Sequence, residues 1–259
     1  MSRSLVCLHA HPDDEALLTA GTLARAVAEG HRVTLVVATD GEAGLAEAGP
    51  GGQLAAQRVA ELAESAQALG VHRIVRLGYP DSGMVNEHAG FAALDPAGPA
   101  RRLGEVLAEE SADLLLGYDS NGGYGHPDHV QVHRVARAAA ALTGVRLLEA
   151  TVDRTALMRA LWLVHRSGLA PADFAPERMR QSYAPRSELT HRVNVRRFLN
   201  QKRASMRAHT SQAGGGTDTR TLAFCLRLPR PAYRLAFGSE WFIEPGRPSP
   251  SALIDDIWH

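Results

Sequence analysis

The residues His11-Pro12-Asp13-Asp14-Glu15 place one imidazole and two adjacent aspartates directly after an apolar run at positions 5–8. The apolar run predicts a buried strand, and the carboxyl end of a strand is where an open α/β sheet binds its ligands. Because two buried carboxylates are costly without partners or a metal, this cluster indicates a cation site.

A second cluster follows the apolar residues 114–116, where a glycine-rich loop ends in the sequence His-Pro-Asp-His at positions 126–129. Each cluster has a histidine followed by proline, which is favoured at the first position of a helix. A second potential ligand comes three residues later in each cluster. His11 with Asp14, and His126 with His129, are therefore one helical turn apart and can each face one point.

A mononuclear catalytic site uses three protein ligands and a water molecule, so the candidates must divide into ligands and other groups. The candidates are His11, Asp13, Asp14, His126, Asp128 and His129. We assign His11, Asp14 and His129 as ligands, with Asp13 and His126 beside the open coordination position. Two histidines and a carboxylate suit Zn²⁺, and the same set also accepts Fe²⁺.

At these residues the chain resembles the LmbE-like, or PIG-L, family of metal-dependent N-deacetylases. The family's first motif is matched by residues 10–15 and its second by residues 126–129, with softer matches at 41–44, 58–61, 69–71, 77–81 and 209–212. The resemblance implies that His11, Asp14 and His129 bind zinc. It also implies that Asp13 is the general base and that His126 stabilises the oxyanion.

Four further residues receive weaker assignments. The resemblance suggests that Arg58 contacts the substrate and that Tyr124 reaches the reacting carbonyl. We expect Asp128 to orient a ligand histidine by hydrogen bonding to its far nitrogen. Glu240 lies in the aromatic-rich segment 233–243, which we expect to pack near the pocket, and it is a candidate for supporting the ligands or contacting the substrate.

Apolar runs and helical patterns alternate regularly over the first 150 residues. The expected strands are 5–8, 32–38, 73–77, 113–117 and 146–150, and the expected helices are 15–29, 53–69, 100–110 and 127–142. This rhythm predicts a Rossmann-like, doubly wound, mostly parallel sheet. We expect a single domain over 1–259, with an α/β core at 1–150 and an irregular C-terminal part at 151–259 packing on it.

Long connections follow several of the expected strands, at 40–52, 80–98 and 121–125, so they are expected to wall the pocket at the carboxyl edge. The C-terminal part is expected to hold helices around 154–166 and 196–208. The basic residues of 196–208 alternate with apolar ones, which is typical of a solvated amphipathic helix. Residues 212–220, with three consecutive glycines, are expected to form a flexible loop.

The composition excludes several classes of protein. Lys and Arg number 28, as do Asp and Glu, which leaves no electrostatic footprint for nucleic acid or an anionic membrane. Cys7 and Cys225 do not make a disulfide framework. The chain has no room for a signal peptide before position 5 and no apolar run near the roughly 20 residues of a membrane span. We therefore expect a cytoplasmic protein with a small-molecule N-acyl substrate, such as an amino-sugar derivative.

The predicted reaction is zinc-dependent hydrolysis of an acetamide by metal-activated water, with Asp13 as base. Three alternatives stay open. A mycothiol-conjugate amidase of the same family would cleave a related amide. A non-haem Fe²⁺ oxygenase would use His11, Asp13 and His129 as its triad, although such enzymes are usually all-β. A metal-containing module that only binds a sugar or thiol would leave Asp13 without a use.

Overall fold

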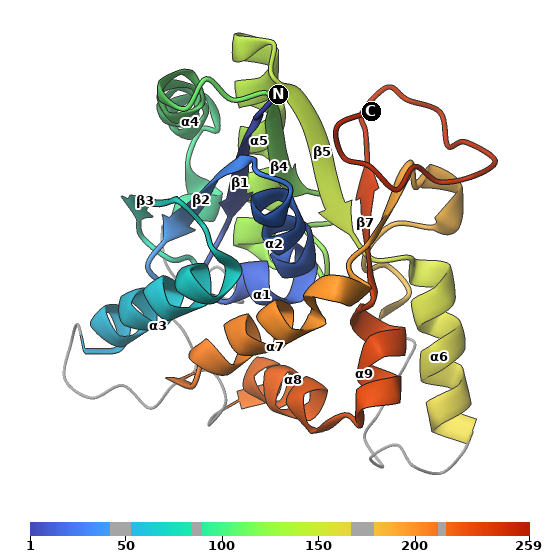
Figure 1. Ribbon diagram of the computed structural model, residues 1–259. Coiled ribbons are helices and arrows are strands. Elements are labelled where there is room, and N and C mark those ends of the chain that lie inside the picture. The colour runs from blue at the N-terminus through green and yellow to red at the C-terminus, as the bar shows by residue number, and fades with distance from the viewer. Residues whose placement is uncertain (42–52, 84–89, 167–178, 212–215) are drawn as a thin grey trace.

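The computed structural model describes residues 1–41, 53–83, 90–166, 179–211 and 216–259. A seven-stranded sheet with the strand order β3-β2-β1-β4-β5-β7-β6 runs through the molecule (Figure 1). The strands are β1 (Ser4–His9), β2 (Arg32–Thr39), β3 (Arg73–Tyr79), β4 (Leu114–Tyr118), β5 (Arg146–Thr151), β6 (His191–Asn194) and β7 (Ser239–Ile243). The first five are parallel, and β7 pairs antiparallel with both β5 and β6.

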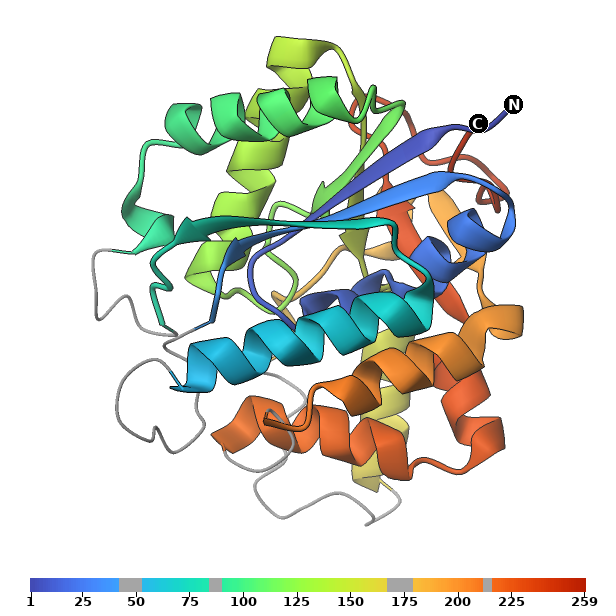
Figure 2. The same ribbon diagram turned by 60° about the vertical axis from the view of Figure 1, so that its left-hand side comes forward.

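Helices cover both faces of this sheet (Figure 2). They are α1 (Asp14–Leu18), α2 (Ala20–Ala28), α3 (Gln53–Leu69), α4 (Ala97–Glu109), α5 (Pro127–Thr143), α6 (Arg154–Arg166), α7 (Leu199–Ala208), α8 (Gly216–Arg227) and α9 (Arg230–Phe237). The helices α4 and α5 lie together on one face, and α1, α2, α3 and α7 lie on the other. The predicted doubly wound, mostly parallel fold is confirmed.

The central strands are apolar because both of their faces are covered. All six residues of β1 are buried, as are all five of β4. The chain runs outward from β1 through β2 to β3 and then returns to place β4 on the other side of β1. The strand order therefore reverses between β1 and β4, and such a switch point is where doubly wound sheets bind ligands at the carboxyl ends of their strands.

Two expectations about local structure were wrong. The expected helix at 15–29 is interrupted at Thr19, whose φ of −129° leaves the helical region. The Thr19 hydroxyl bonds to His9 Nε2 at 2.8 Å, and such a competing side-chain bond favours a helix break. The second is the flexible loop expected at 212–220, because residues 216–220 belong to the helix α8, which begins at Gly216. Residues 212–215 lie outside the described residues.

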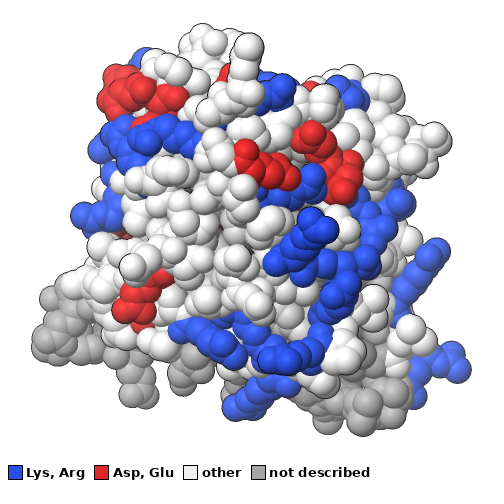
Figure 3. Space-filling view, viewed as in Figure 1, with Lys and Arg blue, Asp and Glu red and all other residues white. Residues whose placement is uncertain are grey.

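Charge is distributed unevenly although the chain is neutral overall. Residues 196–237 contain nine Lys and Arg but one acidic residue. Figure 3 shows basic side chains gathered over the part of the surface formed by α7–α9. On α7, Arg207 is exposed and Met206 is buried, as expected of an amphipathic helix, whereas Lys202 is buried and does not belong to a solvated basic face. Among the described residues, no helix combines the length and apolarity that a membrane crossing requires.

Candidate active site

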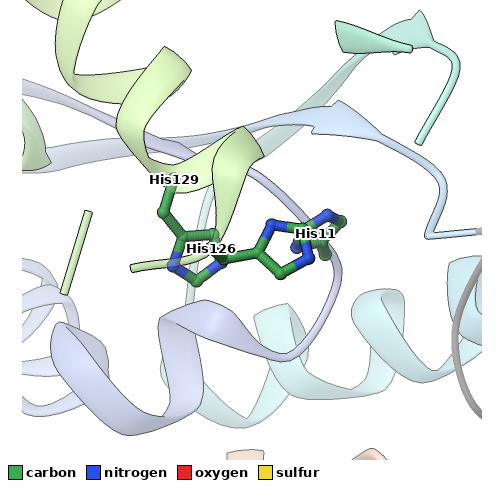
Figure 4. Close-up of side chains that lie close together, drawn as sticks. All are labelled: His11, His126 and His129. Carbon is green, nitrogen blue, oxygen red and sulfur yellow. The ribbon is translucent and has the colours of Figure 1, made fainter. Parts of the chain in front are cut away.

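The switch point of the sheet brings the two histidine motifs together. Strand β1 ends at His9, and β4, hydrogen-bonded beside it, leads through the glycine-rich loop to α5. His11 follows β1, His126 is the residue before α5, and His129 lies in the first turn of that helix (Figure 4). Residues separated by more than 110 positions in the chain thus meet at the carboxyl edge.

The three imidazoles form a compact buried cluster. One ring nitrogen from each lies within 4.8 Å of the others, and the side chains come from opposite sides toward a common point (Figure 4). Ring centroids are 4.7 Å apart for His11 and His126 and 5.1 Å apart for His126 and His129. At most 6% of any of these residues is exposed, so each nitrogen needs a partner inside the protein.

The carboxylate of Asp14 lies between two of these rings. One oxygen is 3.2 Å from His129 Nε2, and the other is 3.4 Å from His11 Nδ1. The same oxygen accepts the His11 main-chain N–H at 2.9 Å, which fixes the carboxylate. The structure therefore brings together His11, Asp14 and His129, the three residues predicted to bind a metal.

This donor set fits a divalent cation. His129 is 1% exposed; its Nε2 lies 3.2 Å from an Asp14 oxygen without the geometry of a hydrogen bond, and its Nδ1 has no hydrogen-bond partner among the described residues. A buried imidazole nitrogen without a partner is costly, and a metal ion beside Asp14 would take the free lone pair. Two imidazoles and a carboxylate are ligands for Zn²⁺ or Fe²⁺.

The far side of His11 faces two carboxylates. His11 Nε2 donates to Asp128 at 3.2 Å and lies 3.5 Å from Asp81. Burial alone would lower the pKa of His11, but Asp128, Asp14 and Asp81 outweigh it and hold the pKa well above its ordinary value. Asp128 also accepts the Ser82 N–H at 3.0 Å. It therefore contacts the His11 nitrogen that faces away from Asp14, which is the kind of contact expected for it if His11 is a ligand.

Asp81 is a site residue that the sequence reasoning did not assign. It follows β3 at the same edge of the sheet, and it is 6% exposed. Together with His11 and Asp128 it forms a second group whose ligand atoms lie within 4.8 Å of one another. The sequence held two signals for it, the soft family match at 77–81 and its place a few residues after the expected strand 73–77.

His126 is oriented differently from the other two histidines. Its Nδ1 accepts the main-chain N–H of Asp128 at 3.1 Å, so a neutral ring carries its proton on Nε2. Burial, followed by the neighbouring His11 and His129, lowers the pKa of His126 to about 4. The ring is therefore neutral near pH 7, with an N–H donor available.

Asp13 has an unusual backbone. Its φ of 111° lies in the left-handed region, and it precedes α1 without capping that helix through its side chain. Its carboxylate is 3.5 Å from the Arg58 guanidinium. Burial, opposed by Arg58, raises the pKa of Asp13 to about 6, which suits a group that exchanges a proton near neutrality.

Arg58 and Tyr124, the two residues expected to contact the substrate, differ in their exposure to solvent. Arg58 is 4% exposed and donates to the carbonyls of Gly41 at 2.6 Å and Pro12 at 2.8 Å, so its guanidinium faces the main chain. Tyr124 is 38% exposed, and its ring centroid is 5.0 Å from that of the buried His129.

The Glu240 carboxylate lies at the N-terminus of α2. It accepts the main-chain N–H groups of Gly21 at 2.9 Å and Thr22 at 2.7 Å, and it pairs with Lys202 at 2.5 Å. None of these partners belongs to the histidine cluster. The contacts give Glu240 a structural role at the start of a helix.

The loop that carries Tyr124 is shaped by Asp119, which the sequence reasoning also missed. Asp119 accepts the main-chain N–H groups of Asn121 at 3.1 Å and Gly123 at 2.9 Å and pairs with the Thr151 hydroxyl. Gly122 has a φ of 60°, and a Cβ there would lie 2.5 Å from a main-chain nitrogen of α5. Only glycine fits where the loop passes this helix.

Fold and site together define a doubly wound α/β protein with a buried histidine–carboxylate cluster that could hold a metal ion. The family model for PIG-L, described as GlcNAc-PI de-N-acetylase, matches residues 6–140. The chain belongs to this family, which confirms the resemblance carried by its two histidine motifs.

Curated relatives match most of the chain. A protein from Saccharomonospora viridis named 1D-myo-inositol 2-acetamido-2-deoxy-alpha-D-glucopyranoside deacetylase is 37% identical over 97% of this chain and 98% of its own length. A protein of the same name from Acidothermus cellulolyticus is 36% identical over 82% of this chain and 80% of its own.

Solved structures share the fold at lower identity. The N,N'-diacetylchitobiose deacetylase from Pyrococcus horikoshii superposes with a TM-score of 0.61 at 21% identity, covering 97% of this chain and 88% of its own. A 4-carboxy-2-hydroxymuconate hydratase from Pseudomonas putida gives a TM-score of 0.63 at 14% identity, covering 97% of this chain and 99% of its own. Because a deacetylase and a hydratase share this fold, the reaction must be argued from the site.

Proposed function

We propose that this protein is a metal-dependent N-deacetylase that hydrolyses the acetamide of an N-acetylated amino-sugar derivative. The observation that carries the proposal is the carboxylate of Asp13, which stands next to the Asp14–His11 pair, does not cap its helix, and lies 3.5 Å from the Arg58 guanidinium. The names of the full-length curated relatives make an N-acetylglucosaminyl inositol the first candidate substrate.

His11, Asp14 and His129 would hold the metal, with Zn²⁺ as first choice and Fe²⁺ compatible with the same ligands. When bound, such an ion lowers the pKa of a water molecule and polarises the amide carbonyl. His126 is left out of the ligand set because its Nδ1 is occupied by the Asp128 N–H. Asp128 keeps the His11 ring in place from behind.

Asp13 is assigned the proton transfers. With a pKa near 6 it is mostly ionised at neutral pH and can accept the proton of the attacking water. It can then deliver that proton to the nitrogen of the departing amine, because a general acid–base group works best when its pKa lies near the operating pH.

His126 is assigned to the oxyanion. Since its pKa is about 4 and its Nδ1 accepts the Asp128 N–H, it acts as a neutral Nε2–H donor. An oriented donor of this kind stabilises the developing negative charge by about 3 kcal/mol. Tyr124, partly exposed beside His129, lies where a substrate would enter.

The alternatives differ in what supports them. An all-β oxygenase is inconsistent with the doubly wound sheet and the PIG-L match. A metal-containing module that only binds a sugar or thiol would not need a proton-transfer group, so it does not explain the Asp13 carboxylate. An amidase of the same family would use the same residues on a different amide, so only substrate trials separate it from a deacetylase.

The test measures release of primary amine by the zinc-loaded protein. The substrates are the N-acetylglucosaminyl inositol, N-acetylglucosamine, N,N'-diacetylchitobiose and a mycothiol S-conjugate. We expect fastest release from the first, and Asp13→Asn should lower kcat by about 10²-fold or more with zinc retained. Preferred cleavage of the S-conjugate would establish the amidase, and no amine from any substrate by metal-loaded protein would refute the proposal.

A further inference from the structure

The main chain at Asp13 is strained, and something must hold it. A non-glycine residue with φ near 111° sits outside the usual allowed regions, which is costly unless its surroundings impose it. Among the described residues, Ser111 and Tyr183 are the other non-glycine residues with positive φ, and neither lies in a histidine motif. The conformation of Asp13 decides where its carboxylate points relative to His11 and Asp14.

The peptide group between Pro12 and Asp13 is held from both ends by opposite charges. Its carbonyl oxygen accepts from the Arg58 guanidinium at 2.8 Å. Its N–H donates to a carboxylate oxygen of Glu15 at 3.1 Å. Because the carbonyl and the N–H belong to one rigid plane, these two contacts together fix the orientation of the peptide and hence the φ of Asp13.

The two groups that bind this peptide, the Glu15 carboxylate and the Arg58 guanidinium, are themselves held in place by other residues. The other oxygen of Glu15 accepts from the Ser65 hydroxyl of α3 at 2.5 Å and from His209 Nε2, just after α7, at 2.7 Å. Glu15 is fully buried and His209 is 1% exposed. A buried carboxylate with donors from three elements cannot rotate away without leaving one of them unpaired.

The Arg58 guanidinium is held by a hydrogen bond to Gly41 and by close packing against it. It donates to the carbonyl of Gly41 at 2.6 Å, and a Cβ built on Gly41 would overlap the guanidinium. The residues after His209 are tied to α3 as well, because Glu61 accepts from the Thr210 hydroxyl at 2.9 Å and the Ser211 N–H at 2.7 Å. The C-terminal part of the chain therefore supports the first motif directly.

We propose that Glu15, anchored by His209, and Arg58 are positioning residues that clamp the Pro12–Asp13 peptide and aim the Asp13 carboxylate. This inference rests on the proposed function, in which Asp13 moves the proton. It gives Arg58 a role on the enzyme's own main chain in place of the substrate contact suggested by its position in the sequence.

The test compares Glu15→Ala and Glu15→Gln with Ser205→Ala in the zinc-loaded enzyme. Ser205 is an equally buried neighbour that bonds Ser65 at 2.7 Å and makes no hydrogen bond to Glu15, so it controls for loss of a buried hydrogen bond. We expect Glu15→Ala to lower kcat about 10–100-fold, as a displacement of about 1 Å would, with KM and zinc content unchanged. Glu15→Gln keeps an acceptor for the Asp13 N–H and should fall between Glu15→Ala and the wild type, while Ser205→Ala keeps the wild-type kcat.

Two further measurements separate this inference from the proposed function. In an Asp13→Asn background, Glu15→Gln should have no further effect on the residual rate, because the group being aimed is gone; independent multiplication of the two losses would overturn the clamp. If Asp13→Asn alone keeps full activity, the proposed function fails instead. In the metal-free protein, hydrogen exchange at residues 10–18 should be faster in Glu15→Ala than in Ser205→Ala, and equal exchange would also overturn the clamp.

Arg58→Lys tests the other half. A lysine ammonium cannot span the Pro12 and Gly41 carbonyls as the planar guanidinium does. The clamp predicts a lower kcat with KM unchanged. A raised KM with unchanged kcat would overturn this part and return Arg58 to substrate binding.

Discussion

The buried pair of Lys202 and Glu240 offers a stability prediction that can be worked from the structure. Lys202 is 1% exposed and Glu240 3%, and their charged atoms are 2.5 Å apart. Lys202→Met removes the positive charge and keeps most of the apolar side chain. Glu240 is then left as a buried carboxylate whose remaining donors are the main-chain N–H groups of Gly21 and Thr22 at the start of α2.

Removing one partner of a buried ion pair destabilises a protein by about 3–5 kcal/mol. The two remaining N–H donors and the helix dipole keep part of the Glu240 charge satisfied, so we expect about 3 kcal/mol for Lys202→Met. Glu240→Gln should cost nearer 4–5 kcal/mol, since it leaves the buried Lys202 ammonium without its carboxylate partner and with the carbonyl of Leu17, at 2.7 Å, as an acceptor. In the double variant both charges are gone, and the loss should fall short of the sum of the two single losses by about 2 kcal/mol or more.

The assay is equilibrium unfolding in urea of the chelator-treated proteins, followed by tryptophan fluorescence and far-ultraviolet circular dichroism. Coincident transitions would establish two-state unfolding. Additive losses, or single losses each below about 1 kcal/mol, would refute the account of an energetically coupled buried pair. Zinc content of Lys202→Met should equal that of the wild type, and a selective loss of zinc would indicate that Glu240 supports the metal site after all.

Three other expectations are independent of this pair. His129→Ala should lose stoichiometric zinc by elemental analysis while His133→Ala, in the next turn of α5, retains it; full zinc content in the first variant would remove His129 from the ligand set. Gly122→Ala should destabilise the protein by at least about 1–3 kcal/mol in the same unfolding assay, from its positive φ and its close approach to α5, and an unchanged midpoint would contradict that packing. The hydrogen bond from Arg32, with Arg73, lowers the pKa of Glu110 to about 2 from an ordinary 4.5, so its stabilisation is present above pH 4.5 and is lost as the pH falls toward 2. The arginines are half-exposed, so solvent screens the interaction. Glu110→Gln should remove this part of the acid dependence, and an unaltered pH profile of stability would show that the interaction contributes nothing.

Much of the α/β core could be predicted because its signals are local. A strand buried on both faces must be apolar throughout, so β1 and β4 are visible as short apolar runs. The one-turn spacing of His126 with His129 follows from helix geometry, whereas His11 and Asp13 precede α1, so the expected helical spacing of His11 with Asp14 was wrong and their contact comes from the turn before that helix. The break at Thr19 was not visible, because it depends on a bond to the buried His9 ring that exists only when the sheet has formed.

What the sequence by itself determined is the set of reactive groups and the edge of the sheet where they gather. Only the tertiary structure decided what each group contacts. His209 meets Glu15 across 194 positions, and Asp81 reaches His11 from another strand. These pairings depend on how helices pack against the sheet, and hydrophobic periodicity carries no information about such distant neighbours. The orientation of Asp13 was likewise settled by packing, since the groups that clamp its peptide come from α1 and α3 and are anchored after α7.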